Sequence, residues 1–148
     1  MKRSALLLAA ALCAPAFAAR AADCIDQAAS AYQVNADVLR AIAIVESRVR
    51  PDAVRVNPGG SVDRGLFQIN SVHLPELARV GIDAGDLHDV CIASHVASLL
   101  LARQIRRFGD TWTAIGAFHS TRPDKRDAYA GKVREVFEAI SRLSSGVR

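Results

Sequence analysis

The sequence LRAIAIVES at residues 39–47 is the stretch from which the rest of the chain can be interpreted. Leu39, Ile42 and Ala43 recur at helical spacing, and Glu46 falls on the same stripe one turn later. A carboxylate that ends an apolar helical face is poorly solvated, which raises its pKa. Such a group can stay protonated near neutral pH and give its proton to a leaving oxygen. The alternative is a glutamate at the rim of the core, satisfied by a helix N-terminus or an arginine.

The N-terminus has the three parts of a secretory signal peptide. Lys2 and Arg3 precede an apolar run at residues 5–14, and small residues follow as far as Ala21. The run is too short to anchor the chain permanently in a bilayer. We therefore expect residues 1–21 to be removed on export, and residues 22–148 to form one soluble domain.

Cleavage at this point changes the charge of the protein. The full chain has 19 Lys and Arg residues against 15 Asp and Glu residues, a net charge of +4. Lys2, Arg3 and Arg20 leave with the signal peptide and no acidic residue does, which brings the net charge to +1. A nearly neutral domain gives little support to a nucleic-acid partner, and we expect none.

The cysteines predict one disulfide. Cys13 lies in the signal peptide, so Cys24 and Cys91 remain, and two cysteines in an exported domain most simply pair. The bond would close a long loop and contribute roughly 3–5 kcal/mol. His88 and His95 lie at helical spacing from Cys91, but no compact second pair of ligands accompanies them, so we expect no metal.

The remaining sequence predicts several helices and one irregular segment. Periodicity, capping residues and helix breakers predict helices at about residues 23–32, 37–50, 75–81, 89–108 and 124–143, and residues 112–119 form another apolar segment. Asp23 would cap the first helix, and Pro51 would mark the exit from the Glu46 helix. Residues 50–64 are rich in Pro, Asn and Gly and suit a turn with at most a short hairpin. The fold class is therefore mainly α, one small helical domain with an irregular or short β-hairpin lobe that forms a cleft.

A second carboxylate lies in the irregular lobe. Asp63 follows Glu46 by 17 positions, and the turn-rich sequence between them could place the two opposite one another. Paired carboxylates in unlike environments break glycosidic bonds: one protonates the leaving oxygen and the other steadies or attacks the positive sugar. The alternative is a turn residue that bonds its own backbone.

Four motifs in order resemble the soluble lytic transglycosylases and the goose- and hen-type lysozymes. The Glu46–Ser47 pair resembles the first transglycosylase motif, and GLFQIN at 65–70 resembles the second, usually GLMQ. AIGAFHS at 114–120 resembles the third, AYNAG, and Tyr129 resembles the isolated tyrosine of the fourth. The short chain, the export signal, the two mature cysteines and the His-Ser pair further resemble the specialised subgroup that includes IagB and IpgF.

This resemblance implies a lysozyme-like fold and cleavage of the β-1,4 bond between N-acetylmuramic acid and N-acetylglucosamine in peptidoglycan. Glu46 would protonate the glycosidic oxygen and then, as a carboxylate, accept a proton from the muramyl 6-hydroxyl as a 1,6-anhydro ring closes. Asp63 would steady positive charge near the anomeric carbon, as in hen-type lysozymes. Gln68 and Tyr129 would position the sugar and the glutamate, and Ser47 would support the acetamido group or the backbone. No metal or organic cofactor is needed.

The third motif departs from the family pattern. Phe118 replaces the usual tyrosine, so it can stack on a sugar but has no hydroxyl group to donate a hydrogen bond. Packing in the core is an equal alternative for Phe118. His119 replaces asparagine; it could donate to an acetamido carbonyl, with added pH dependence.

The resemblance also implies a setting. The partners would be peptidoglycan glycan strands and a secretion, conjugation or pilus apparatus, and the location would be the periplasm of a Gram-negative bacterium. We expect a monomer without a membrane anchor after signal cleavage. Two alternatives stay open: a muramidase that releases the product with water, and a catalytically weak peptidoglycan-binding adaptor.

Overall fold

The structure is a computed structural model that describes residues 8–146. Lys2 and Arg3, the basic start of the expected signal peptide, lie outside the described residues. Three short strands and six α-helices occupy the described range, with 3-10 turns at Ser71–His73, Ala78–Val80 and Asp86–His88. The elements are α1 (Leu8–Tyr32), α2 (Ala36–Ser47), β1 (Val54–Val56), β2 (Val62–Arg64), β3 (Ile69–Asn70), α3 (Leu74–Leu77), α4 (Val90–Phe108), α5 (Trp112–His119) and α6 (Pro123–Ser145). This is the small, mainly α, lysozyme-like domain that the sequence predicted.

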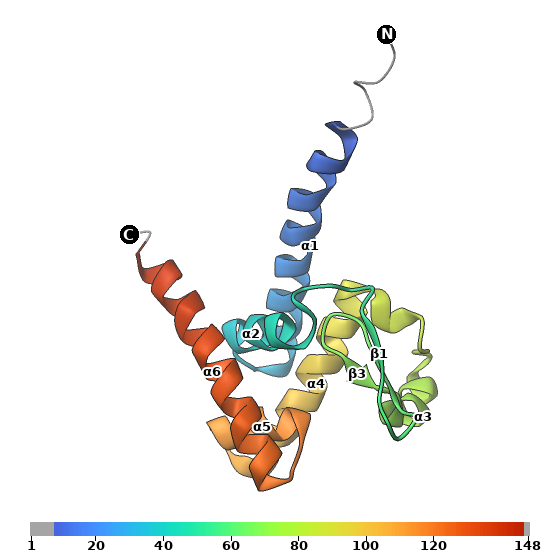
Figure 1. The fold of residues 1–148 in the computed structure, drawn as a ribbon, viewed down its shortest axis with the longest axis vertical. Coiled ribbons are helices and arrows are strands. Elements are labelled where there is room, and N and C mark those ends of the chain that lie inside the picture. The colour runs from blue at the N-terminus through green and yellow to red at the C-terminus, as the bar shows by residue number, and fades with distance from the viewer. Residues whose placement is uncertain (1–7, 147–148) are drawn as a thin grey trace.

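The first helix starts earlier than predicted. It runs without a break from Leu8 to Tyr32, so Asp23 lies inside the helix and does not cap it. The residues before Asp23 are mostly alanine, the residue with the highest helix propensity, which explains why the helix continues toward the N-terminus. Figure 1 shows this part of α1 extending away from the other elements.

Both ends of α2 are fixed by local hydrogen bonds. The side chain of Asn35 accepts from the backbone N–H groups of Asp37 and Val38, at 2.8 and 3.2 Å. At the other end Arg48 adopts a left-handed conformation with φ of 55° and closes the last turn. The helix therefore ends at Ser47, before Pro51, and Glu46 lies in its final turn.

The irregular lobe is a three-stranded antiparallel sheet in the order β1-β2-β3. Arg55 pairs with Asp63 across β1 and β2, and Asp63 pairs with Asn70 across β2 and β3. The predicted short hairpin is therefore confirmed, and a third strand is added to it. GLFQIN, which was too short to assign from sequence, forms a turn at residues 65–68 followed by β3.

The turn before β3 needs glycine at its first position. Gly65 has φ of 75°, a backbone conformation that residues with a side chain rarely adopt. A Cβ at this position would collide with the carbonyl oxygen of Leu87. This close approach lets Leu66 and Phe67 enter the core, where neither is exposed to solvent. The turn thereby holds the sheet against the helices.

Helix α4 runs through the centre of the domain. Its apolar stripe, with Ala93, Ala97 and Leu101 buried, packs against α1 and α5. Cys24 of α1 is bonded to Cys91 of α4 across 67 residues of sequence, which confirms the predicted disulfide. No helix among residues 8–146 is long and apolar enough to cross a membrane.

The last helix packs against both α2 and α5 (Figure 1). It starts at Pro123, one residue before the predicted position, and ends at Ser145, two residues after the predicted end. Tyr129 and Val133 are buried on its inner face. This packing brings Tyr129 to the end of α2 that carries Glu46.

Candidate active site

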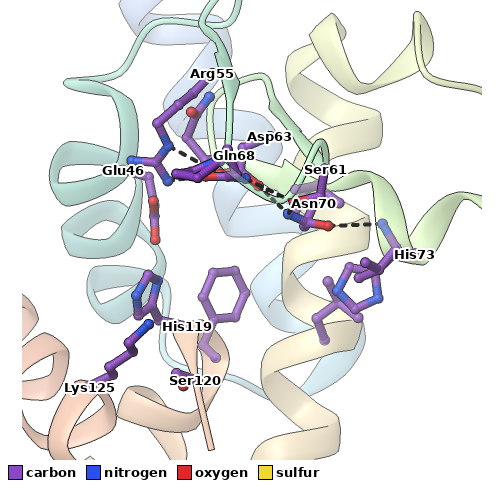
Figure 2. Close-up of a pocket in the computed structure, with 16 residues that line it drawn as sticks. Glu46, Arg55, Ser61, Asp63, Gln68, Asn70, His73, His119, Ser120 and Lys125 are labelled. Atoms are coloured by element: carbon purple, nitrogen blue, oxygen red, sulfur yellow. Dashed lines mark hydrogen bonds and ion pairs between the residues drawn. The ribbon is translucent and has the colours of Figure 1, made fainter. Parts of the chain in front are cut away.

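A cavity of about 540 Å³ lies between the end of α2, the sheet and α5. Figure 2 shows side chains from the sheet on one side of it and from α5 and α6 on the other. Four of the residues predicted from sequence to bind or cleave the substrate line it together with Glu46, namely Asp63, Gln68, Phe118 and His119. Residues that are 73 positions apart in the sequence thus share one cleft.

Glu46 is held by one strong hydrogen bond. The Tyr129 hydroxyl donates to Oε1 of Glu46 at 2.7 Å, and only 6% of Tyr129 is exposed. Burial raises the pKa of Glu46 above its ordinary value, although the bond from Tyr129 and the charge of Arg55 act in the opposite direction. Burial and the neighbouring Glu46 also raise the pKa of Tyr129, which keeps it a proton donor in this bond.

Asp63 has the opposite environment. Only 5% of the residue is exposed, and its Oδ2 accepts from the Nε and Nη2 of Arg55 at 3.1 and 2.9 Å and from Asn57 at 3.0 Å. Its Oδ1 accepts from Asn70 at 2.6 Å. Burial acts to raise the pKa of Asp63, but the bonds from Asn57, Arg55 and Asn70 outweigh it and lower the pKa.

The cleft therefore contains two carboxyl groups whose pKa values are shifted in opposite directions. Burial raises the pKa of Glu46, and the four N–H groups that donate to Asp63 lower the pKa of that carboxyl group. This difference is the arrangement that lets one carboxyl act as an acid while the other remains a negative charge.

Gln68 lies between the sheet and Glu46 and is fixed by backbone contacts. Its amide nitrogen donates to the carbonyl oxygens of Ala53 and Gly65, at 3.2 and 3.1 Å. Its backbone has φ of 47°. Because both amide hydrogens are used inside the lobe, the side-chain oxygen is the part of Gln68 that a ligand in the cavity could contact.

Ser47 points into the protein. Its hydroxyl donates to the carbonyl oxygen of Leu66 at 2.8 Å and accepts from the backbone N–H of Arg50 at 2.9 Å. Ser47 is 4% exposed and is absent from the residues that line the cavity. Of its two expected roles, this geometry favours support of the backbone: Ser47 ties the end of α2 to the turn that carries Gln68.

The two unusual residues of the third motif both line the cavity. Phe118 is half-buried: it packs against the core and also lines the cavity. His119 stacks on Tyr129, with ring centroids 4.8 Å apart and planes 9° apart. Burial lowers the pKa of His119, and the charges of Arg55 and Lys125 lower it further. His119 is therefore neutral near pH 7, and covers the tyrosine that holds Glu46.

Each residue of the rejected metal cluster has another contact. Cys91 is in the disulfide, and His88 Nδ1 lies 2.8 Å from the carbonyl oxygen of Pro51. His95 packs edge-to-face on Tyr32. These contacts account for the three residues without a metal ion.

Sequence reasoning missed the residues that surround Asp63. Arg55, Asn57 and Asn70 lie in or next to the strands that flank it, and their spacing gives no sign of a shared partner. Lys125 and Lys132 were also missed, although they lie four residues before and three after Tyr129 on one helical face. That spacing was a usable signal.

Comparison with known proteins agrees with this geometry. Residues 23–136 match the transglycosylase SLT domain family. The chain is 36% identical to invasion protein IagB of Salmonella typhi over 129 residues, which cover 84% of this chain and 81% of that protein. It is 36% identical to the X polypeptide of Escherichia coli over 136 residues, covering 87% and 80%. It is 32% identical to protein IpgF of Shigella flexneri over 126 residues, covering 84% and 83%.

A mainly helical domain whose cleft contains two carboxyl groups with oppositely shifted pKa values is typical of a lysozyme-like glycan-cleaving enzyme. The chain belongs to the transglycosylase SLT family, in the specialised subgroup of IagB and IpgF, and is a lytic transglycosylase. Its substrate class is accordingly the peptidoglycan of the cell wall.

Proposed function

We propose that this enzyme cleaves the β-1,4 bond from N-acetylmuramic acid to N-acetylglucosamine and leaves a 1,6-anhydro end on the muramyl residue. Glu46, protonated at the start, gives its proton to the glycosidic oxygen as the bond between that oxygen and the muramyl C1 breaks. The Glu46 carboxylate then takes the proton of the muramyl 6-hydroxyl while the oxygen of that hydroxyl bonds to C1. Glu46 ends protonated, so the cycle consumes no water and needs no cofactor.

The observation that carries this proposal is the hydrogen bond between Tyr129 and Glu46. At 2.7 Å it fixes one carboxyl oxygen, Oε1, and leaves the other to meet the substrate. Burial raises the pKa of Glu46, which supports its first role as an acid, and the bond from Tyr129 stabilises the carboxylate needed in its second role.

Asp63 supports the proposal in another way. As an ionised group beside the cleft, it stabilises the positive charge that develops at C1 in the transition state. Its two oxygens already accept four N–H bonds, so it has little capacity to take a proton from water. This favours ring closure over hydrolysis.

The other cleft residues position the sugar in this proposal. Gln68 offers its side-chain oxygen to a sugar hydroxyl or amide, and Phe118 provides an apolar surface for a sugar ring. His119, held on the Tyr129 ring, donates to an acetamido carbonyl. These contacts fix the muramyl residue relative to Glu46.

We further propose that residues 1–21 are a signal peptide and that residues 22–148 act as a monomer in the periplasm. The basic, apolar and small-residue order of the N-terminus and the disulfide between Cys24 and Cys91 support export to an oxidising compartment. Three relatives are invasion proteins by name. We infer from this that the enzyme opens the wall locally for a secretion, conjugation or pilus machine.

The test is digestion of purified peptidoglycan by the mature protein and by Glu46→Gln. The variant keeps the shape and the bond to Tyr129 but removes the acid, so release of muropeptides should fall at least a hundredfold, within the range of ~10²–10⁴ for a general acid. Glu138→Gln, on the exposed part of α6, is the matched control and should digest like the wild type. Equal digestion by Glu46→Gln and the wild type would refute the proposal, and binding without digestion by the wild type would indicate an adaptor.

A further inference from the structure

A second cavity, of about 370 Å³, adjoins the first on the side of α6. The two cavities share Glu46, Arg55, His119 and Lys125, so a ligand beside Glu46 can extend from one into the other. The second cavity continues past Ala128 and Tyr129 to Lys132. It is therefore a side branch of the substrate cleft at the point where the bond breaks.

Besides Arg55 and Glu46, this branch contains two lysines from one face of α6. Lys125, Tyr129 and Lys132 follow each other at four and three residues, the spacing of one helical stripe. The sequence has three lysines; one is Lys2, and the other two line this cavity. Neither Lys125 nor Lys132 forms an ion pair within the described residues.

The positive charge of the two lysines is not cancelled by the acidic groups of the site. Asp63 is already paired with Arg55 at 2.9 Å. Burial raises the pKa of Glu46, which disfavours its ionised form. The charges of Arg55 and Lys132 both act on Glu46, and Figure 2 shows Lys125 pointing toward His119. The branch therefore favours an anion next to Glu46.

The sugar rings of a glycan strand carry no charge. In peptidoglycan the carboxylates lie on the substituent at O3 of muramic acid, either on the lactyl group itself or on the peptide attached to it. The muramyl residue must lie beside Glu46 for its C1 to react. Because Glu46 lines both cavities, the second cavity is within reach of the substituent on that sugar. Ammonium groups pair with such carboxylates as compact charges.

We propose that the second cavity binds the carboxylate-bearing substituent of the muramyl residue, and that Lys125 and Lys132 thereby select anionic, muramyl-containing glycans. This inference rests on the proposed function, because it places the muramyl residue beside Glu46. It assigns to α6 a role in recognition in addition to its support of Glu46 through Tyr129.

Binding is measured on the full mature protein carrying Glu46→Gln, so that it can be followed without cleavage. The three probes are peptide-bearing glycan strands, the same strands stripped of peptide by an amidase, which leaves the lactyl carboxylate, and chitohexaose, which has no carboxylate. Lys125→Gln and Lys132→Gln are added singly and together, with Lys132→Arg to retain the charge. Arg142→Gln removes one charge from the exposed far end of α6 and is the control.

Each Lys→Gln change should weaken binding of the anionic probe about two- to fivefold, the range for an exposed ion pair, and the double change about four- to twenty-fivefold. Chitohexaose binding should stay unchanged, and Lys132→Arg should bind like the parent. Added salt should reduce the difference in affinity for the anionic probe between the parent and the Lys→Gln variants. A loss confined to peptide-bearing strands identifies the peptide carboxylates as the ligand, and a loss confined to stripped strands identifies the lactyl carboxylate. A loss on both kinds of strand shows that the lysines bind either carboxylate. Binding of the anionic probes by the double variant with the same affinity as the parent would overturn the inference, as would an equal loss on chitohexaose. Failure of the proposed function would show separately, as no cleavage by the wild type.

Discussion

The structure predicts that Ser47→Ala destabilises the domain more than the loss of one hydroxyl normally does. The Ser47 hydroxyl donates to the carbonyl oxygen of Leu66 and accepts from the N–H of Arg50, so alanine leaves two backbone groups without this partner. The Leu66 carbonyl is buried and the Arg50 amide is partly buried, which gives a cost of about 2–3 kcal/mol. For a domain of this size, the melting temperature should fall by about 6–15 °C.

Ser94→Ala is the matched control. Ser94 is also fully buried, but its hydroxyl donates, at 2.7 Å, to the carbonyl oxygen of Val90 one turn earlier in the same helix. That carbonyl already accepts a helical N–H bond, so the change should cost less than about 1 kcal/mol. Melting is followed by circular dichroism and calorimetry on the mature protein. Equal losses of stability in the two variants would refute the assignment of Ser47 as the tie between α2 and the Gln68 turn.

Three further predictions concern stability. Replacing Cys24 and Cys91 by serine should remove about 4 kcal/mol, because the disulfide closes a loop of 67 residues; an unchanged denaturation midpoint under oxidising conditions would contradict this. Glu46→Gln should raise the melting temperature at pH 7. Burial raises the pKa of Glu46, so the folded protein loses stability as pH rises and this group ionises, whereas glutamine does not ionise. The gain should vanish below about pH 4, and a constant gain from pH 3 to 8 would be inconsistent with a buried carboxyl group. Gly65→Ala should cost about 2–4 kcal/mol, from its positive φ and the collision with Leu87, whereas Gly59→Ala, with open space around it, should change stability little; similar melting of the two would exclude the close packing of this turn.

Much of the helical architecture could be predicted because it is encoded locally. The apolar stripe from Val90 to Phe108 and the stop at Gly109 gave α4 to within one residue. The disulfide followed from counting the cysteines that remain after the signal peptide. The start of α1 could not be predicted, since the alanine-rich residues before Asp23 have no local signal that ends a helix there.

The sheet depends on contacts that are distant in sequence. GLFQIN becomes a turn because Gly65 lies against Leu87, which is 22 positions later in the sequence. The pairing of Arg55 with Asp63 depends on the register of β1 and β2, and all three residues of β1 are exposed, so no burial pattern marks it. Glu46 could be proposed from its helical stripe alone, but the donors around Asp63 become visible only when the sheet is formed.

The most direct test of the mechanism is digestion of peptidoglycan in water enriched in the heavy isotope of oxygen. If Glu46 passes the proton of the muramyl 6-hydroxyl, the muropeptides from the wild type should be one water lighter than hydrolysis products and should carry no heavy oxygen at the muramyl C1. Products with reducing ends that contain one heavy oxygen atom would contradict ring closure and would show that water completes the reaction.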